Sequence, residues 1–215
     1  MKNLLYKELR LVAHPATILF LALSAMLLIP NYPYYVIFFY TGLGIFFCCL
    51  SGRENHDIFY TMSMPVRKLD LVRGRFLFVF LLELTQILAA IPFAAIRQKL
   101  PMPGNLVGMD ANIAFFGLSL GMLGVFNLVF FGKYYRRPDK VGMAFCMASI
   151  AVAAYMILAE VCAHAVPFVR DRLDTPDTMF LAEKCWTLLA GAAVYAGLTL
   201  VACRRAVRVF ETLDL

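Results

Sequence analysis

One segment of the sequence has the residue spacing of a catalytic nucleophile. Residues 117–121 (Gly-Leu-Ser-Leu-Gly) match the Gly-x-Ser-x-Gly pattern of serine hydrolases, and His164 could act as the base for Ser119. In those enzymes the serine sits on a sharp turn between a strand and a helix, whereas Ser119 lies within a continuous apolar stretch and has no polar neighbour to activate it. The context therefore disfavours an intramembrane serine protease. Inhibition by a serine-directed probe, lost in Ser119→Ala, is the test.

Nucleotide and metal chemistry are not indicated by the sequence either. A phosphate-binding loop of the form Gly-x-x-x-x-Gly-Lys-Ser/Thr does not occur, and Gly132-Lys133 follows an apolar segment rather than a loop that could hold phosphates. The six cysteines lie in or beside apolar segments without a CxxC pair or a histidine at ligand spacing. We therefore expect no catalytic residue, no metal site and no cofactor in this chain.

Two pairs of polar residues interrupt apolar segments. Glu83 and Gln86 are one helical turn apart and about 10 Å inside such a segment, where an ionisable group is expected to face protein or water. They could line a translocation cavity, or Glu83 could join helices to each other. Glu160 and His164 are four residues apart near the end of another apolar segment, which favours an interfacial position.

The composition indicates the solvent in which these residues lie. Of 215 residues, 62% are hydrophobic and 16% charged, and the mean hydropathy is +0.76, far more apolar than a soluble domain. The apolar residues form blocks long enough to cross a bilayer as helices. We predict an all-α, polytopic membrane protein consisting of one transmembrane domain, residues 1–215. Its six spans are predicted at residues 15–30, 34–51, 76–96, 111–132, 141–163 and 185–203.

The distribution of basic residues predicts the orientation of these spans. Fifteen of the 20 basic residues fall in the N-terminal segment, the 52–75 loop, the 133–140 loop and the C-terminal segment, and only five fall in the other connections. By the positive-inside rule, the first group is cytoplasmic, so both termini are inside the cell. The net charge of +6 then reflects topology and contact with anionic lipids of the inner leaflet. No nucleic-acid-binding motif accompanies it.

Two cytoplasmic segments are predicted to be structured. Residues 1–14 place Leu5, Leu9 and Val12 on one helical stripe, with Asn3, Lys7 and Arg10 on the other, as in a helix lying in the membrane interface. An unordered basic flank is the alternative.

The second segment is the 52–75 loop, in which Asn55 or Asp57 could cap a short helix that ends before Pro65. Ile58, Phe59 and Met62 would form its apolar face. Such a helix is suited to docking in a groove of a soluble partner.

A family resemblance follows from the N-terminal half. Lys7-Glu8-Leu9 in the interfacial segment, a short hairpin, Asp57, and the runs 63–68 (Ser-Met-Pro-Val-Arg-Lys) and 70–75 (Asp-Leu-Val-Arg-Gly-Arg) resemble bacterial type-2 ABC transporter permeases. The resemblance is to the small six-span kind that exports phenol-soluble modulins and bacteriocins. It covers residues 1–80, while the later spans agree only in number and orientation.

The resemblance implies a function and partners. Residues 53–64 would be the coupling helix, and Asn55, Asp57, Ile58, Phe59 and Met62 would dock ABC ATPase subunits that bind ATP and Mg²⁺. The permease would act as a dimer, of identical chains or paralogues, in the bacterial cytoplasmic membrane, and would export amphipathic, antimicrobial or toxin peptides. Spans two, three and five are expected to form the cavity walls. The alternative is a membrane subunit that recruits or regulates a cytosolic partner without transporting anything.

Overall fold

The computed structural model describes residues 2–12, 14–100 and 104–212, and the elements in those ranges are all helical. Five helices are long and apolar enough to cross a membrane: α3 (Tyr35–Glu54), α5 (Lys68–Lys99), α6 (Ile113–Tyr134), α7 (Val141–Ala165) and α8 (Leu181–Glu211). The predicted all-α, polytopic membrane architecture is confirmed.

The first predicted span, unlike the other five, is not a continuous α-helix. It consists of α2 (Pro15–Ala22) followed by the 3₁₀ segment η2 (Leu23–Leu28). Because a 3₁₀ helix rises about 2.0 Å per residue and an α-helix about 1.5 Å, these two segments together cover about 24 Å. His14 begins α2, since its Nδ1 accepts a hydrogen bond from the Ala16 amide at 3.1 Å, and Pro15 occupies the first turn.

The N-terminal segment consists of α1 (Lys2–Lys7) and the π-helical η1 (Glu8–Val12), and it meets the α2–η2 segment at an angle of 80°. The predicted two-sided pattern of this segment is wrong in part. Lys7, expected on the polar outer face, is directed inward, and Leu9 is 53% exposed. The π-helical hydrogen bonds at Glu8 change the number of residues per turn, so a 3.6-residue period does not describe this segment. The side chains of Asn3 and Val12 lie outside the described residues.

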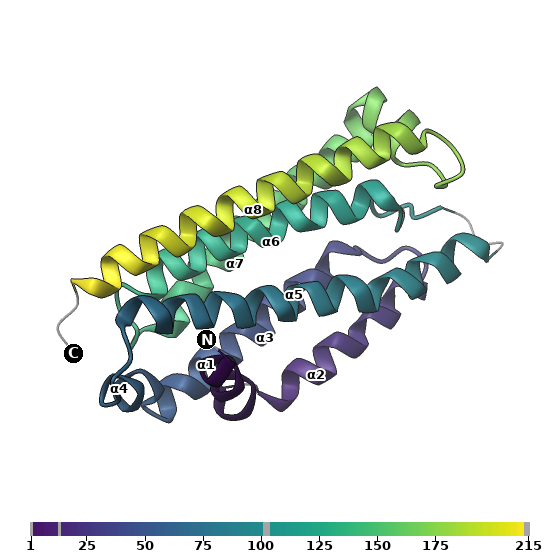
Figure 1. The fold of residues 1–215 in the computed structure, drawn as a ribbon. Helices are drawn as coiled ribbons and strands as arrows, with labels where there is room; N and C mark the ends of the chain where they lie inside the picture. Colours follow the sequence, from purple (N-terminus) through teal and green to yellow (C-terminus); the bar gives the residue numbers. More distant parts are fainter. Residues whose placement is uncertain (1, 13, 101–103, 213–215) are drawn as a thin grey trace.

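The long helices form two groups that run side by side (Figure 1). One group contains α6, α7 and α8, and the other contains α2, α3 and α5. Close approach of α6 to α8 depends on glycine, because a Cβ on Gly117 would lie 2.6 Å from the Thr187 carbonyl oxygen. Aromatic side chains join the two groups, as shown by the rings of Phe76 on α5 and Phe131 on α6, which are 4.6 Å apart between centroids.

The two ends of the bundle differ in structure. One end holds α1, η1, α4 (Asp57–Met62), the start of α5 and the end of α8, where Lys68 donates a hydrogen bond to the Glu211 carbonyl oxygen. The other end holds the α5–α6 connection and the π segment η3 (Val169–Leu173). There the Asp110 amide donates to Asp174 at 2.8 Å, and burial raises the pKa of the Asp174 carboxyl while this hydrogen bond opposes the rise.

Candidate functional site

The short helix α4 follows the end of α3 after a tight turn. α3 continues through Glu54, and His56 adopts a left-handed conformation, φ 48°, before α4 begins at Asp57. The helix predicted at 53–64 is therefore limited to residues 57–62. The predicted caps are also wrong, because His56 occupies the N-cap without a side-chain hydrogen bond and the Asp57 carboxylate is directed into the protein. Ser63, before Pro65, closes the C-terminus of α4.

The residues of α4 separate into an outer and an inner face. Phe59 is 67% exposed and Tyr60 is 62% exposed, whereas Ile58 and Met62 are partly buried and pack against the core. The predicted apolar face of Ile58, Phe59 and Met62 is therefore divided between the two faces. Sequence reasoning missed Tyr60, although its neighbour Phe59 was the signal that this turn of the helix is apolar.

A hollow of about 180 Å³ lies beside the outer face of α4. It is lined by the end of α3, by Ile58 and Phe59 of α4, and by Pro138 and Asp139 of the α6–α7 connection. Arg53 donates a hydrogen bond to the Asp139 carbonyl oxygen at 3.2 Å, which ties the α3 end to that connection. Asn55 is exposed near this hollow without lining it. The exposed aromatics and the hollow together form a surface on which a partner could dock.

The inner face of α4 belongs to a cluster of four charged side chains. Arg75 Nη2 donates to Asp57 Oδ2 at 2.7 Å, and Arg75 Nε lies 2.6 Å from Glu8 Oε2. Lys7 Nζ lies 2.8 Å from Asp57 Oδ1 and 3.2 Å from Glu8 Oε1, and it donates to Thr61 Oγ1 at 3.0 Å. The cluster therefore joins α1, η1, α4 and α5 at one point.

The electrostatics of this cluster are balanced. Arg75 and Glu8 are each 1% exposed, and a buried ion without a partner costs several kcal/mol. Two basic and two acidic groups sum to zero charge, so each ion has a counter-ion inside the protein. Because each buried charge in the cluster is neutralised by its neighbours only in this arrangement, sliding α4 relative to α5 would separate the ion pairs.

The sequence placed Glu8 and Arg75 in the motifs that carry the family resemblance, and Arg75 also in the positive-inside count, but it did not pair them. The pairing joins residues far apart in the sequence, and a single sequence holds no signal for it.

Glu83 and Gln86 are buried between helices and do not line an open cavity in this structure. Tyr195 Oη on α8 donates to Glu83 Oε2 at 2.5 Å, and Asn127 Nδ2 on α6 donates to the same oxygen at 3.1 Å. Gln86 Nε2 donates to Ser24 Oγ on η2 at 2.8 Å. Of the two alternatives left open by the sequence, the structure favours helix joining. Glu83 connects α5 to the other helix group.

Ser119 does not meet a base in the described part of the chain. Its hydroxyl is fully buried in α6 and forms no hydrogen bond there, and His164 is exposed at the far end of α7. Gly117 and Gly121, which complete the hydrolase-like pattern, instead allow α8 and Tyr155 of α7 to approach α6. The arrangement gives no support to a serine protease.

A second opening lies between α3 and α7. This groove has a volume of about 590 Å³ and is apolar along most of its wall, including Val36, Met156 and Ile157. Glu160 and His164 provide its polar groups, and Glu160 Oε2 accepts a hydrogen bond from the Met109 amide at 3.1 Å. The groove thus presents one carboxylate beside a long apolar surface.

Comparison with known proteins gives one match. A family model described as ABC-2 family transporter protein matches residues 3–204. No curated protein and no solved structure matches the chain.

Proposed function

The chain belongs to the ABC-2 family of transporter proteins and is a multi-pass membrane permease, and we propose that it is the membrane subunit of an ATP-driven peptide exporter. In this proposal both termini and α4 face the cytoplasm, and two permease chains act with two ATPase subunits that bind ATP and Mg²⁺. The bacterial cytoplasmic membrane is the proposed location. The surface of α4 is the observation that carries the proposal.

The outer face of α4 supports docking of an ATPase. Phe59 and Tyr60 are exposed on α4 beside a hollow, and aromatic anchors beside a pocket are typical of protein interfaces. Met64, 39% exposed, extends the same surface beyond the end of α4. Short turns at both ends of α4 fix the position of this surface between α3 and α5.

The charged cluster supports transmission of movement from α4 to the membrane helices. A force applied to Phe59 reaches Asp57 through two residues of one helical turn, and Asp57 is bonded directly to Arg75 of α5 and Lys7 of α1. In the proposed mechanism, closure of the ATPases displaces α4, and the cluster carries α1, η1 and the start of α5 with it. The two helix groups then move relative to one another.

The groove between α3 and α7 supports an amphipathic substrate. A long apolar wall would bind the apolar side chains of such a peptide, and Glu160 would attract a lysine or the N-terminal ammonium group. α3 and α7 are the second and fifth predicted spans, two of the three expected to form the cavity. Export of cationic amphipathic peptides is the proposed activity.

The test of the docking surface is loss of the ATPase. We expect the double substitution Phe59→Ala and Tyr60→Ala to weaken binding of a co-expressed Walker-A ATPase from a neighbouring reading frame. Each lost aromatic anchor costs about 2 kcal/mol, so the two together lower the affinity about a thousandfold. The matched control is Phe168→Ala with Trp186→Ala, since these two aromatics, 51% and 72% exposed, lie at the opposite end. Equal ATPase retention by both variants would refute docking at α4.

The same surface would also serve a non-transporting subunit that recruits a cytosolic partner. Transport of an amphipathic peptide would use the α3–α7 groove, whereas recruitment of a partner at α4 would not. Uptake of a labelled cationic peptide into inverted vesicles, dependent on ATP and reduced by Glu160→Gln, separates the two functions. Retention of ATPase binding with no uptake of such peptides would favour the recruiting subunit.

A further inference from the structure

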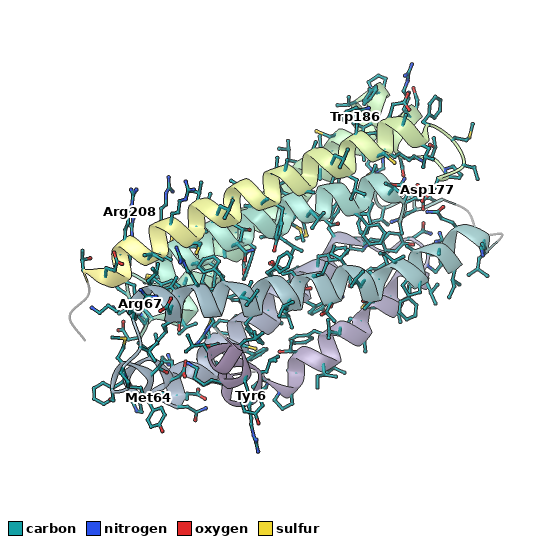
Figure 2. All side chains as sticks on the ribbon, viewed as in Figure 1. Tyr6, Met64, Arg67, Asp177, Trp186 and Arg208 are labelled. Atoms are coloured by element: carbon teal, nitrogen blue, oxygen red, sulfur yellow. The ribbon has the colours of Figure 1, made fainter. Side chains whose placement is uncertain are left out.

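Six basic side chains form a continuous surface at the end of the bundle that holds α4. They come from the end of α6, the turn after it, the start of α7 and the end of α8. These residues, the basic rim, are Lys133, Arg136, Arg137, Lys140, Arg205 and Arg208. Figure 2 shows Arg208 on α8 with its side chain projecting away from the neighbouring helices.

The basic rim surrounds two adjoining hollows. One, about 290 Å³, lies between the end of α6 and the start of α7, where Met143 and Ala144 are its apolar wall. The other, about 260 Å³, lies between α6 and α8, with Phe131 and Val209 as apolar wall. Arg136 lines both. Each hollow therefore combines positively charged groups, which would attract the anionic headgroup of a phospholipid, with hydrocarbon, which would contact its acyl chains.

The charges of the basic rim are not compensated by the described residues of the protein. Over residues 2–12, 14–100 and 104–212, none of the six forms an ion pair, although Asp139 lies in the same turn. The opposite end of the bundle differs. There Arg170 pairs with Asp171 at 2.8 Å, Arg172 with Glu183 at 3.3 Å, and Lys184 with Asp177 at 3.6 Å.

This contrast points to an external counter-ion. Like charges close together repel each other, and an anion from outside the protein would relieve that repulsion. Basic pockets between the ends of membrane helices are suited to the headgroups of anionic lipids, and each arginine or lysine near a charged bilayer surface contributes favourably. Met143 on α7 is exposed in the wall of the first hollow, where an acyl chain would lie.

We propose that the basic rim binds the headgroup of an anionic phospholipid, with the phosphate held by Arg136 between the two hollows and the acyl chains against α7 and α8. A bound lipid would neutralise the ends of α6 and α8 and hold these two helices to the α7 start. The rim shares the α6–α7 connection with the hollow beside α4 but lies away from the α3–α7 groove.

The experiment measures lipid binding to the purified full-length chain. Phosphatidylglycerol is titrated into protein in a zwitterionic detergent, and bound lipid is counted by native mass spectrometry, with phosphatidylcholine as the neutral reference. We expect Arg136→Gln with Arg205→Gln to bind phosphatidylglycerol about thirtyfold more weakly, because two favourable phosphate-attracting charges are removed. Arg136→Lys keeps the charge that attracts the anionic lipid and is expected to keep the lipid bound.

Three comparisons keep the result interpretable. Arg170→Gln with Arg172→Gln removes the same charge from the opposite end and is expected to leave phosphatidylglycerol affinity unchanged. Excess inorganic phosphate is expected to leave the lipid bound, because phosphate cannot contact the apolar walls. Unfolding midpoints without lipid verify that the variants fold.

Equal lipid affinity for wild type and Arg136→Gln with Arg205→Gln overturns the proposal, as does displacement by inorganic phosphate. Retention of lipid together with loss of the ATPase would assign the rim to the partner protein and equally overturn it.

Discussion

Replacement of Arg75 by alanine is the perturbation that tests the charged cluster most directly. Arg75 is 1% exposed and contacts Glu8 and Asp57, so its removal leaves two buried carboxylates with Lys7 as their only counter-ion in the cluster. Breaking a buried pair by removing one partner costs about 3–5 kcal/mol. On the scaling for soluble domains of this size, that corresponds to a fall of about 10 °C in the unfolding midpoint.

The measurement needs a matched ion pair that is exposed. Arg67 and Asp70 provide it, because their side chains meet at 2.9 Å but Arg67 is 80% exposed at its side chain. Such a pair contributes between about 0 and 1 kcal/mol, so Arg67→Ala is expected to lower the midpoint of the detergent-purified protein by no more than about 4 °C. A loss in Arg75→Ala no greater than in Arg67→Ala would refute the account of the cluster.

A second variant separates stability from transmission. Arg75→Met with Glu8→Gln removes one ion of each sign and leaves Lys7 paired with Asp57, so the cluster stays balanced. Because a buried ion pair and a well-packed neutral replacement are often similar in free energy, most of the stability should return. The direct charged link from α5 to η1 is gone, however. We expect ATP hydrolysis by the bound ATPase to continue while peptide transport falls, and transport at the wild-type rate would count against transmission through Arg75.

Two further predictions concern the packing of helices. Gly191→Ala should destabilise the protein by about 1–3 kcal/mol, because its Cβ would collide with the Gly117 carbonyl. The control is Gly197→Ala, whose Cβ would meet nothing within 4 Å, and it should be neutral or slightly stabilising. Equal unfolding midpoints for the two variants would contradict the close α6–α8 contact. Glu83→Gln keeps an oxygen that can accept from Tyr195 and should lower the free energy of unfolding by less than about 1 kcal/mol. Glu83→Leu leaves the Tyr195 hydroxyl without this acceptor and should lower it by about 2 kcal/mol or more. Equal stability of the two variants in chemical unfolding would show that Glu83 does not join the helices.

The class of fold could be predicted from the sequence because lipid imposes a strong local rule. Backbone groups in a bilayer must bond within their own segment, so an apolar block of sufficient length is a helix whatever its neighbours are. The end of α4 before Pro65 could also be predicted, because proline cannot continue a helix whatever its surroundings are. The cytoplasmic orientation of the termini, read from the basic residues, remains a prediction.

Tertiary structure alone decided which polar groups meet. Lys7 looked like a surface charge and Arg75 like a positive-inside residue, and only the packing of η1 and α4 against α5 turned both toward Asp57. Glu83 could have faced a cavity until Tyr195, from the last helix, was placed beside it. The physical reason is that hydrophobic periodicity reports only which residues avoid water. Coulombic and hydrogen-bond partners are chosen over a few ångströms between segments far apart in the chain, and those distances exist only once the helices have packed.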